Sequence, residues 1–241
     1  MTRIWLPQSR RRRFLAGGLA VAFLLAGFWG FRLWRLNGDV GRYAKYWSQP
    51  HGGAGGLVYV ALGDSAAQGL GASRPELGYV GLVAARLRAT TSRPVRVINL
   101  SRSGAHIRDV LATQVPRLAG LHADLVTVDV GGNDITSYDR RQFERDAVAL
   151  CSALPAGAVI ADVPYFMHGK WERNAESGAR FLQREAAAHG LRVARLHDAL
   201  RSTGWSGMFT SYAADWFHPN DRGYRVWAQA FWEAIRHEEE R

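Results

Sequence analysis

From residue 57 onward, short apolar runs alternate with longer stretches in which apolar residues recur at helical spacing. The runs that we interpret as strands are 57–62, 95–100, 124–130, 158–163 and 191–196. The stretches that we interpret as helices are 79–89, 107–118, 141–154, 173–188 and 222–235. Apolar strands joined through helices are typical of a parallel sheet covered on both faces. The pattern therefore predicts an α/β domain with its functional site at the carboxyl ends of the strands.

A separate apolar segment precedes this domain. Residues 14–31 contain no charged side chain, and as a helix rising about 1.5 Å per residue they would reach close to the thickness of a bilayer core. Four arginines stand directly before the segment and tryptophans follow it, as expected for a cytoplasmic flank and an aromatic belt. We expect residues 14–36 to form a transmembrane signal anchor, with 1–13 as a basic cytoplasmic tail and the folded domain beyond the cell membrane.

Export followed by release is the alternative. Residues 11–15 also resemble a twin-arginine export signal, which would lead to a secreted protein. Because no small-x-small cleavage site follows the apolar run, the uncleaved single-pass anchor is favoured. Residues 37–56 lack apolar periodicity and end in a glycine-rich sequence, which predicts a flexible linker before a domain at 57–241.

The net charge of +10 raises the question of a nucleic-acid partner. Residues 1–50 hold nine basic residues and one acidic residue, a balance of +8, so the remainder carries only +2. A domain so close to neutral offers no basic surface to phosphates, and we expect no nucleic-acid partner. The single cysteine, Cys151, falls on an apolar helical face and is expected in the core. No cluster has metal-ligand spacing, so neither a metal nor a cofactor is expected.

Candidate chemistry begins where the first expected strand ends, at Gly63, Asp64 and Ser65. A serine beside a small residue at a sharp turn can expose both its hydroxyl and its backbone N–H. Alone, this tripeptide would more often be a tight turn or a helix N-cap.

Three further segments change that interpretation. They stand after the second strand, after the third strand and before the last helix: Asn99 to Gly104, Gly131 to Asp134, and Asp215 to Asn220. With residues 63–65, they resemble the four sequence blocks of the SGNH (GDSL) hydrolase superfamily, in the family's order, over about residues 57–236. Ser101 departs from the glycine that many members carry in the second block. The resemblance is to an esterase or lipase-like bacterial member, anchored or exported.

The resemblance implies a flavodoxin-like three-layer α/β/α sandwich and hydrolysis of carboxylic esters through an acyl-enzyme. It implies Ser65 as the nucleophile, His218 as the base and Asp215 as the acid that orients it. It also implies an oxyanion hole formed by the Ser65 N–H together with Gly104 and Asn133.

The residue types suit these roles. Serine attacks poorly unless a base takes its proton, and histidine can accept and return a proton near neutral pH. Asp215 lies three residues before His218, close enough to bond the ring. A rival pair, His197 and Asp198, follows the fifth expected strand directly, and we interpret it as structural.

Aromatic residues follow the fourth strand and flank the histidine. Tyr165, Phe166 and Trp216 are candidates for an apolar substrate pocket, although core packing would explain them equally well. We expect a serine esterase that acts on small-molecule, lipid or acylated cell-envelope esters. The alternatives are an O-acyltransferase to glycan or lipid, in which an alcohol replaces water, and an anchored binding protein that has lost its chemistry.

Overall fold

The computed structural model describes residues 8–53, 55–167 and 169–236. Five strands form one parallel sheet in the order β2-β1-β3-β4-β5. Their bounds are β1 Leu57–Gly63, β2 Val95–Asn99, β3 Leu125–Asp129, β4 Val159–Ala161 and β5 Arg192–Ala194. This is the strand order of flavodoxin-like folds, so the predicted five-stranded parallel sheet and its fold class are confirmed.

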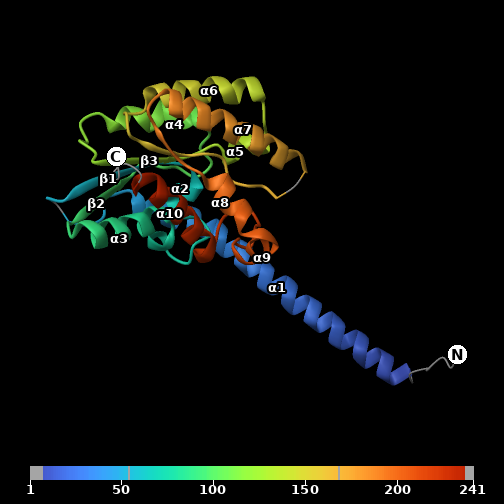
Figure 1. Cartoon of the computed structure of the whole chain (residues 1–241). Coiled ribbons are helices and arrows are strands. Elements are labelled where there is room, and N and C mark those ends of the chain that lie inside the picture. Colours follow the sequence, from blue (N-terminus) through green and yellow to red (C-terminus); the bar gives the residue numbers. More distant parts are fainter. Residues whose placement is uncertain (1–7, 54, 168, 237–241) are drawn as a thin grey trace.

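Helices cover both faces of the sheet, as Figure 1 shows. The longer ones are α1 Gln8–Trp47, α3 Tyr79–Thr91, α4 Ile107–Thr113, α6 Arg140–Ala153, α7 Gly169–Ala188 and α10 Asp221–Arg236. The short ones are α2 Ser65–Gln68, η1 Pro75–Leu77, η2 Val115–Leu118, α5 Gly132–Thr136, α8 Leu196–Ser202 and α9 Gly204–Thr210. The helix predicted at 107–118 is thus divided into α4 and η2, because Pro116 has no N–H to continue the α-helical ladder.

Two cores lie on opposite sides of the sheet. Along β1, Tyr59 and Ala61 pack beneath α3 and α10, whereas Val60 and Leu62 pack beneath α4, α6 and α7. The alternation arises because successive side chains of a strand point to opposite faces of the sheet. A strand that is covered by helices on both faces therefore needs apolar residues at successive positions. Cys151 is buried in the second core, as predicted, and burial raises the pKa of its thiol to about 11.

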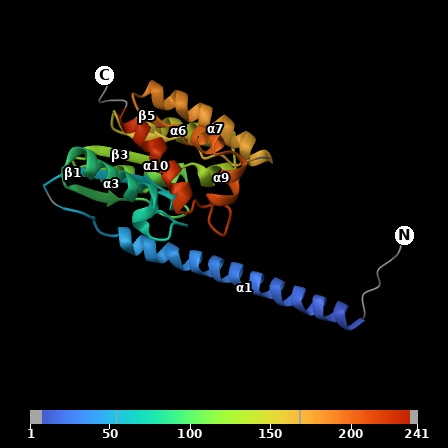
Figure 2. The same ribbon diagram turned by 60° about the horizontal axis from the view of Figure 1, so that its bottom comes forward.

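The N-terminal helix α1 leaves the domain as a long rod (Figures 1 and 2), but its last turns belong to the domain. Tyr43 is fully buried, and its hydroxyl donates to the Ala72 carbonyl at 2.7 Å. Trp47 is also buried, and its Nε1–H donates to the Gln68 carbonyl at 3.0 Å. The linker predicted at 37–56 is therefore helical as far as residue 47, because two large rings one turn apart pack against the loop after β1.

The predicted transmembrane anchor is not confirmed. Within the part of the chain that the structure describes, no helix is long and apolar enough to cross a membrane. Residues 1–7 of the predicted basic tail lie outside the described residues, as do the side chains of residues 8–21 of α1.

Candidate active site

Ser65 is the first residue of α2, and one residue, Asp64, separates it from the end of β1. Gly63 has a φ of +142°, and a Cβ there would lie 2.1 Å from the Asp129 carbonyl, so the close approach of β1 to β3 requires glycine. Asp64 caps α2, because its Oδ1 accepts the Ala66 N–H at 2.9 Å. The turn leaves Ser65 only 5% exposed, at the wall of a cavity.

The structure brings Ser65, His218 and Asp215 together. The Ser65 Oγ lies 2.8 Å from Nε2 of His218, and the other ring nitrogen, Nδ1, lies 2.5 Å from Oδ2 of Asp215. The second carboxylate oxygen of Asp215 accepts the backbone N–H groups of Phe217 at 3.1 Å and His218 at 3.0 Å. These contacts bind the carboxylate into a compact turn before α10, so that it faces the imidazole. The turn is not helical, but it achieves the proximity that the three-residue spacing predicted.

The charge state of Asp215 follows from these contacts. Partial burial opposes ionisation, but the hydrogen bond and the charge of His218, with the two backbone N–H groups, hold the pKa of Asp215 below its ordinary value. A carboxylate that stays ionised orients the ring, so that Nε2 is left to accept a proton from the serine.

The loop that carries His218 is fixed on several sides. The His218 carbonyl accepts the Ala213 N–H at 2.7 Å, and Pro219 forms a β-bridge with Tyr212. Gly71 packs against the back of this loop: its φ is +95°, and a Cβ there would lie 2.4 Å from the Pro219 carbonyl oxygen and 3.0 Å from Cβ of His218. The loop after β1 thus helps to hold the imidazole at the serine.

The predicted oxyanion residues lie around the same turn. In the described chain, the backbone N–H groups of Ser65 and Gly104 have no hydrogen-bond acceptor. Asn133 donates its side-chain amide to the Ala105 carbonyl at 2.9 Å and to Oδ2 of Asp64 at 3.3 Å. Asn133 therefore ties the Ser65 turn to the segment that carries Gly104, although neither Asn133 nor Gly104 lines the cavity.

The cavity beside Ser65 has a volume of about 450 Å³ and a largely aromatic wall. All three predicted substrate-pocket residues, Tyr165, Phe166 and Trp216, line it. Trp171 and Tyr212 also line it, and sequence reasoning missed both. Their only signal was aromatic character, which core packing would explain equally well, because Trp171 lies on α7 and Tyr212 between α9 and α10.

Trp216 connects the cavity to α1. Its φ is +56°, in the left-handed region, and its side chain is 46% exposed. The indole stacks on that of Trp29 in α1 with ring centroids 6.3 Å apart, and Phe209 meets it edge-on at 6.1 Å. The N-terminal helix therefore contacts one of the residues that line the cavity, which the sequence did not predict.

Two buried carboxyl groups at the cavity were also missed. Burial, reinforced by the neighbouring Asp129, raises the pKa of Asp64 to about 8. Burial likewise raises the pKa of Asp129, whose side chain accepts the Nε1–H of Trp227 at 2.9 Å. Burial therefore makes both groups easier to protonate than an exposed carboxyl group, whereas the hydrogen bonds of Asp215 favour its ionised form.

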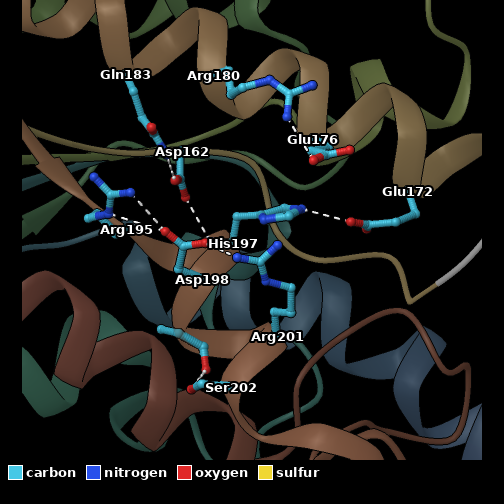
Figure 3. Close-up of polar contacts among 11 residues, drawn as sticks. Asp162, Glu172, Glu176, Arg180, Gln183, Arg195, His197, Asp198, Arg201 and Ser202 are labelled. Atoms are coloured by element: carbon cyan, nitrogen blue, oxygen red, sulfur yellow. Dashed lines mark hydrogen bonds and ion pairs between the residues drawn. The ribbon is translucent and has the colours of Figure 1, made fainter.

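The rival histidine is not paired with its sequence neighbour. His197 lies on α8 and bonds Glu172, whereas Asp198 forms ion pairs with Arg195 and Arg201, as Figure 3 shows. This geometry agrees with the interpretation of His197 and Asp198 as structural residues. Within the described residues, no group of three or more histidine, cysteine or acidic side chains is arranged to hold a metal ion.

A serine hydroxyl bonded to an imidazole, itself bonded to a carboxylate at the carboxyl end of a doubly wound sheet, defines the class of serine hydrolases. Residues 61–226 match the GDSL-like lipase/acylhydrolase family. The chain belongs to this family and is a serine carboxylic ester hydrolase. No curated protein matches the chain.

Solved structures of similar fold include LAE5, an α/β hydrolase enzyme from the metagenome of Lake Arreo, Spain. It is 25% identical, with a TM-score of 0.61 over 74% of this chain and 94% of its own. A variant of Axe2, an acetyl xylan esterase from Geobacillus stearothermophilus, is 23% identical, with a TM-score of 0.62 over 76% and 95%. TesA is 24% identical, with a TM-score of 0.62 over 75% and 99%. At this level of identity, the similarity to Axe2 and TesA is evidence of a shared fold alone.

Proposed function

We propose that the protein hydrolyses carboxylic esters through an acyl-enzyme on Ser65. The observation that carries this proposal is the continuous hydrogen-bonded series from Ser65 Oγ through His218 to Asp215 at the wall of an apolar cavity. His218 accepts the serine proton as Oγ attacks the ester carbonyl, and Asp215 stabilises the imidazolium that forms. His218 then returns the proton to the departing alcohol, which leaves the acyl group on Ser65.

The second half of the reaction repeats the same steps with water. His218 takes a proton from the water that attacks the acyl-enzyme and returns it to Ser65 as the carboxylic acid leaves. In both halves the carbonyl oxygen becomes an oxyanion. We assign its stabilisation to the N–H groups of Ser65 and Gly104 and to the amide of Asn133, which would exchange its long 3.3 Å contact with Asp64 for the oxyanion. One such donor contributes about 3 to 4 kcal/mol in comparable sites.

For the substrate, we propose the ester of a lipid or of acylated cell-envelope material. Support comes from the aromatic wall of the cavity and from its volume of about 450 Å³, which exceeds the needs of an acetyl group. Among the proteins of similar fold, Axe2 is an acetyl xylan esterase, so short acyl groups belong in the same test.

We also propose that the enzyme is held at the cell membrane by its N-terminal segment, with the hydrolase domain outside. Support comes from the sequence: residues 14–31 are uncharged and follow four arginines. In α1, Phe23 and Trp34 are among the large apolar side chains left exposed. The test is cell fractionation of the full chain followed by carbonate extraction. Retention in the membrane pellet is expected, and recovery of the full-length protein in the soluble fraction would contradict the proposal.

The activity is tested with the purified full chain on nitrophenyl esters from acetate to palmitate. We expect turnover that falls to background in Ser65→Ala, with Ser152→Ala, an exposed serine on α6, as the matched control. The full chain is used because Tyr43 and Trp47 are buried in the domain. Absence of turnover at every chain length would refute ester hydrolysis, and turnover by Ser65→Ala would refute the nucleophile.

A further inference from the structure

A buried histidine and a glutamate form a pair next to the cavity but outside the Ser65 site. Nε2 of His197 lies 2.9 Å from Oε1 of Glu172, as Figure 3 shows. The His197 side chain is 5% exposed and that of Glu172 17%. Burial of ionisable groups costs free energy unless hydrogen bonds compensate for it, and the contacts of this pair show which residues it holds in place.

The pair holds the loop that forms one wall of the cavity. The second oxygen of Glu172, Oε2, accepts the backbone N–H of Phe166 at 2.8 Å. The ring of Tyr165 meets the His197 ring edge-on, with centroids 5.6 Å apart and planes at 86°. Tyr165 and Phe166 both line the cavity, so one polar pair fixes the backbone of one wall residue and the ring of the other.

The backbone of His197 is itself held by a residue at the end of β4. Its backbone N–H donates to Oδ1 of Asp162 at 2.8 Å, and Oδ2 of Asp162 accepts the side-chain amide of Gln183 at 2.7 Å (Figure 3). Asp162 directly follows β4, so this support starts at the sheet. Asp162 thus bonds His197, His197 bonds Glu172, and Glu172 bonds Phe166, which is only four residues beyond Asp162 in the chain. This closed series of hydrogen bonds encloses the start of the loop.

One residue of this loop is in an unfavourable backbone conformation. Met167 has a φ of +69°, in the left-handed region that disfavours side chains, and such a residue persists only where its surroundings hold it. Apart from the Glu172 contact, the wall makes few polar contacts, among them the Tyr165 hydroxyl with the Met167 carbonyl at 2.9 Å.

We propose that His197 and Glu172 are positioning residues that fix the 164–167 wall of the cavity and thereby set which acyl chains the enzyme accepts. The proposal rests on the proposed ester hydrolysis.

Ser65 stands on α2 and His218 on the loop before α10, and among the described residues neither is hydrogen-bonded to this wall. The His218 loop meets the wall at its edge, where the Phe166 and Phe217 rings lie 6.1 Å apart and the Tyr212 hydroxyl donates to the Tyr165 carbonyl at 3.4 Å. A moved wall should therefore affect an acyl chain that lies on it more than the reacting atoms. A long acyl chain contacts much of this wall, whereas an acetyl group contacts little of it. Displacement of the wall should therefore reduce activity on long-chain esters more than on acetyl esters.

The test is Glu172→Ala in the full chain, with kcat and KM measured separately on acetyl and octanoyl nitrophenyl esters. We expect the ratio of kcat/KM for octanoyl over acetyl ester to fall about tenfold, mainly through KM, the effect expected from one lost hydrogen bond to a charged group. Glu172→Gln should restore much of the ratio, because its carbonyl oxygen can accept the Phe166 N–H while its amide donates to His197.

Glu176→Ala is the matched control. Glu176 lies one turn further along α7, its side chain is about half exposed, and among the described residues it pairs with Arg180 at 2.7 Å, as Figure 3 shows. The ratio should be unchanged in this variant. Hydrogen exchange of the peptide that contains Phe166 should be faster in Glu172→Ala and unchanged in Glu176→Ala.

A second variant covers the case in which Glu172→Ala fails to fold. His197→Gln keeps Glu172 in place but moves its partner atom, and we expect a smaller fall in the ratio, of about threefold. An unchanged ratio in a folded Glu172→Ala or His197→Gln, or an equal loss on both esters, would overturn the proposal. Failure of the wild-type chain to hydrolyse any ester would instead refute the proposed function itself.

Discussion

Gly71 is the position at which a single added methyl group should separate fold from activity. A Cβ there would lie 2.4 Å from the Pro219 carbonyl oxygen, 3.0 Å from Cβ of His218 and 3.1 Å from Cβ of Ala213. Ordinary contact begins near 3.4 Å, so Gly71→Ala requires a displacement of about 1 Å between the two loops. The loop that must yield carries the imidazole.

The cost can be estimated from these distances. A non-glycine residue at a φ of +95° costs about 1 to 2 kcal/mol, and the overpacking adds about 1 to 3 kcal/mol. A shift of about 1 Å would stretch the 2.8 Å contact between Ser65 and His218 beyond hydrogen-bond length. Misplacement of that size lowers kcat/KM by about 100-fold in well-oriented sites.

The assay combines urea unfolding with steady-state hydrolysis of a nitrophenyl ester. Gly120→Ala is the matched control, because Gly120 has a similar φ of +81° but no atom within 4 Å of its added Cβ. It should lose only the backbone cost of about 1 to 2 kcal/mol and keep its activity. A folded Gly71→Ala with kcat/KM within about threefold of wild type would refute the packing argument.

Three further predictions concern other parts of the molecule. Asp215→Asn should lower kcat by about 10³- to 10⁴-fold with a smaller change in KM, because His218 loses its orienting carboxylate; an unchanged kcat would contradict this. Burial raises the pKa of Asp129 to about 7, so its neutral form stabilises the fold below about pH 4 and this stability is lost as pH rises through 7. Urea titrations of Asp129→Asn should show a smaller loss than wild type, because the raised pKa of Asp64 keeps its own contribution; pH profiles of equal slope in the two proteins would contradict this. Tyr43→Phe should lower the free energy of unfolding by about 1 to 2 kcal/mol in urea titration, since the Ala72 carbonyl loses a buried donor; no change would mean that α1 does not dock on the domain.

Most of the sheet could be predicted from the sequence, because the central strands β1, β3 and β4 are nearly continuous apolar runs followed by turns, and the edge strand β2 alternates buried residues with more exposed ones. The Ser65 site could also be predicted, since Asp215 and His218 are three residues apart and three of the four family sequence blocks fall at strand ends. Strand ends of a parallel sheet meet at one edge, so their order along the chain placed them together before any contact was known.

The contacts that could not be predicted join residues far apart in sequence. Glu172 and His197 are separated by 25 residues and stand on different helices, so no local pattern connects them. Tyr43 and Trp47 did leave a signal, because they lie one helical turn apart, but the polar residues around them favoured a linker. Propensity and periodicity describe one element at a time, whereas docking depends on a surface built from several.

The central claim is that Ser65 becomes acylated with His218 as its base. It is tested most directly by labelling the full chain with a fluorophosphonate probe and mapping the modified peptide by mass spectrometry. We predict a single adduct on Ser65, absent in Ser65→Ala and strongly slowed in His218→Ala. Labelling at another serine, or undiminished labelling of Ser65→Ala, would contradict the account.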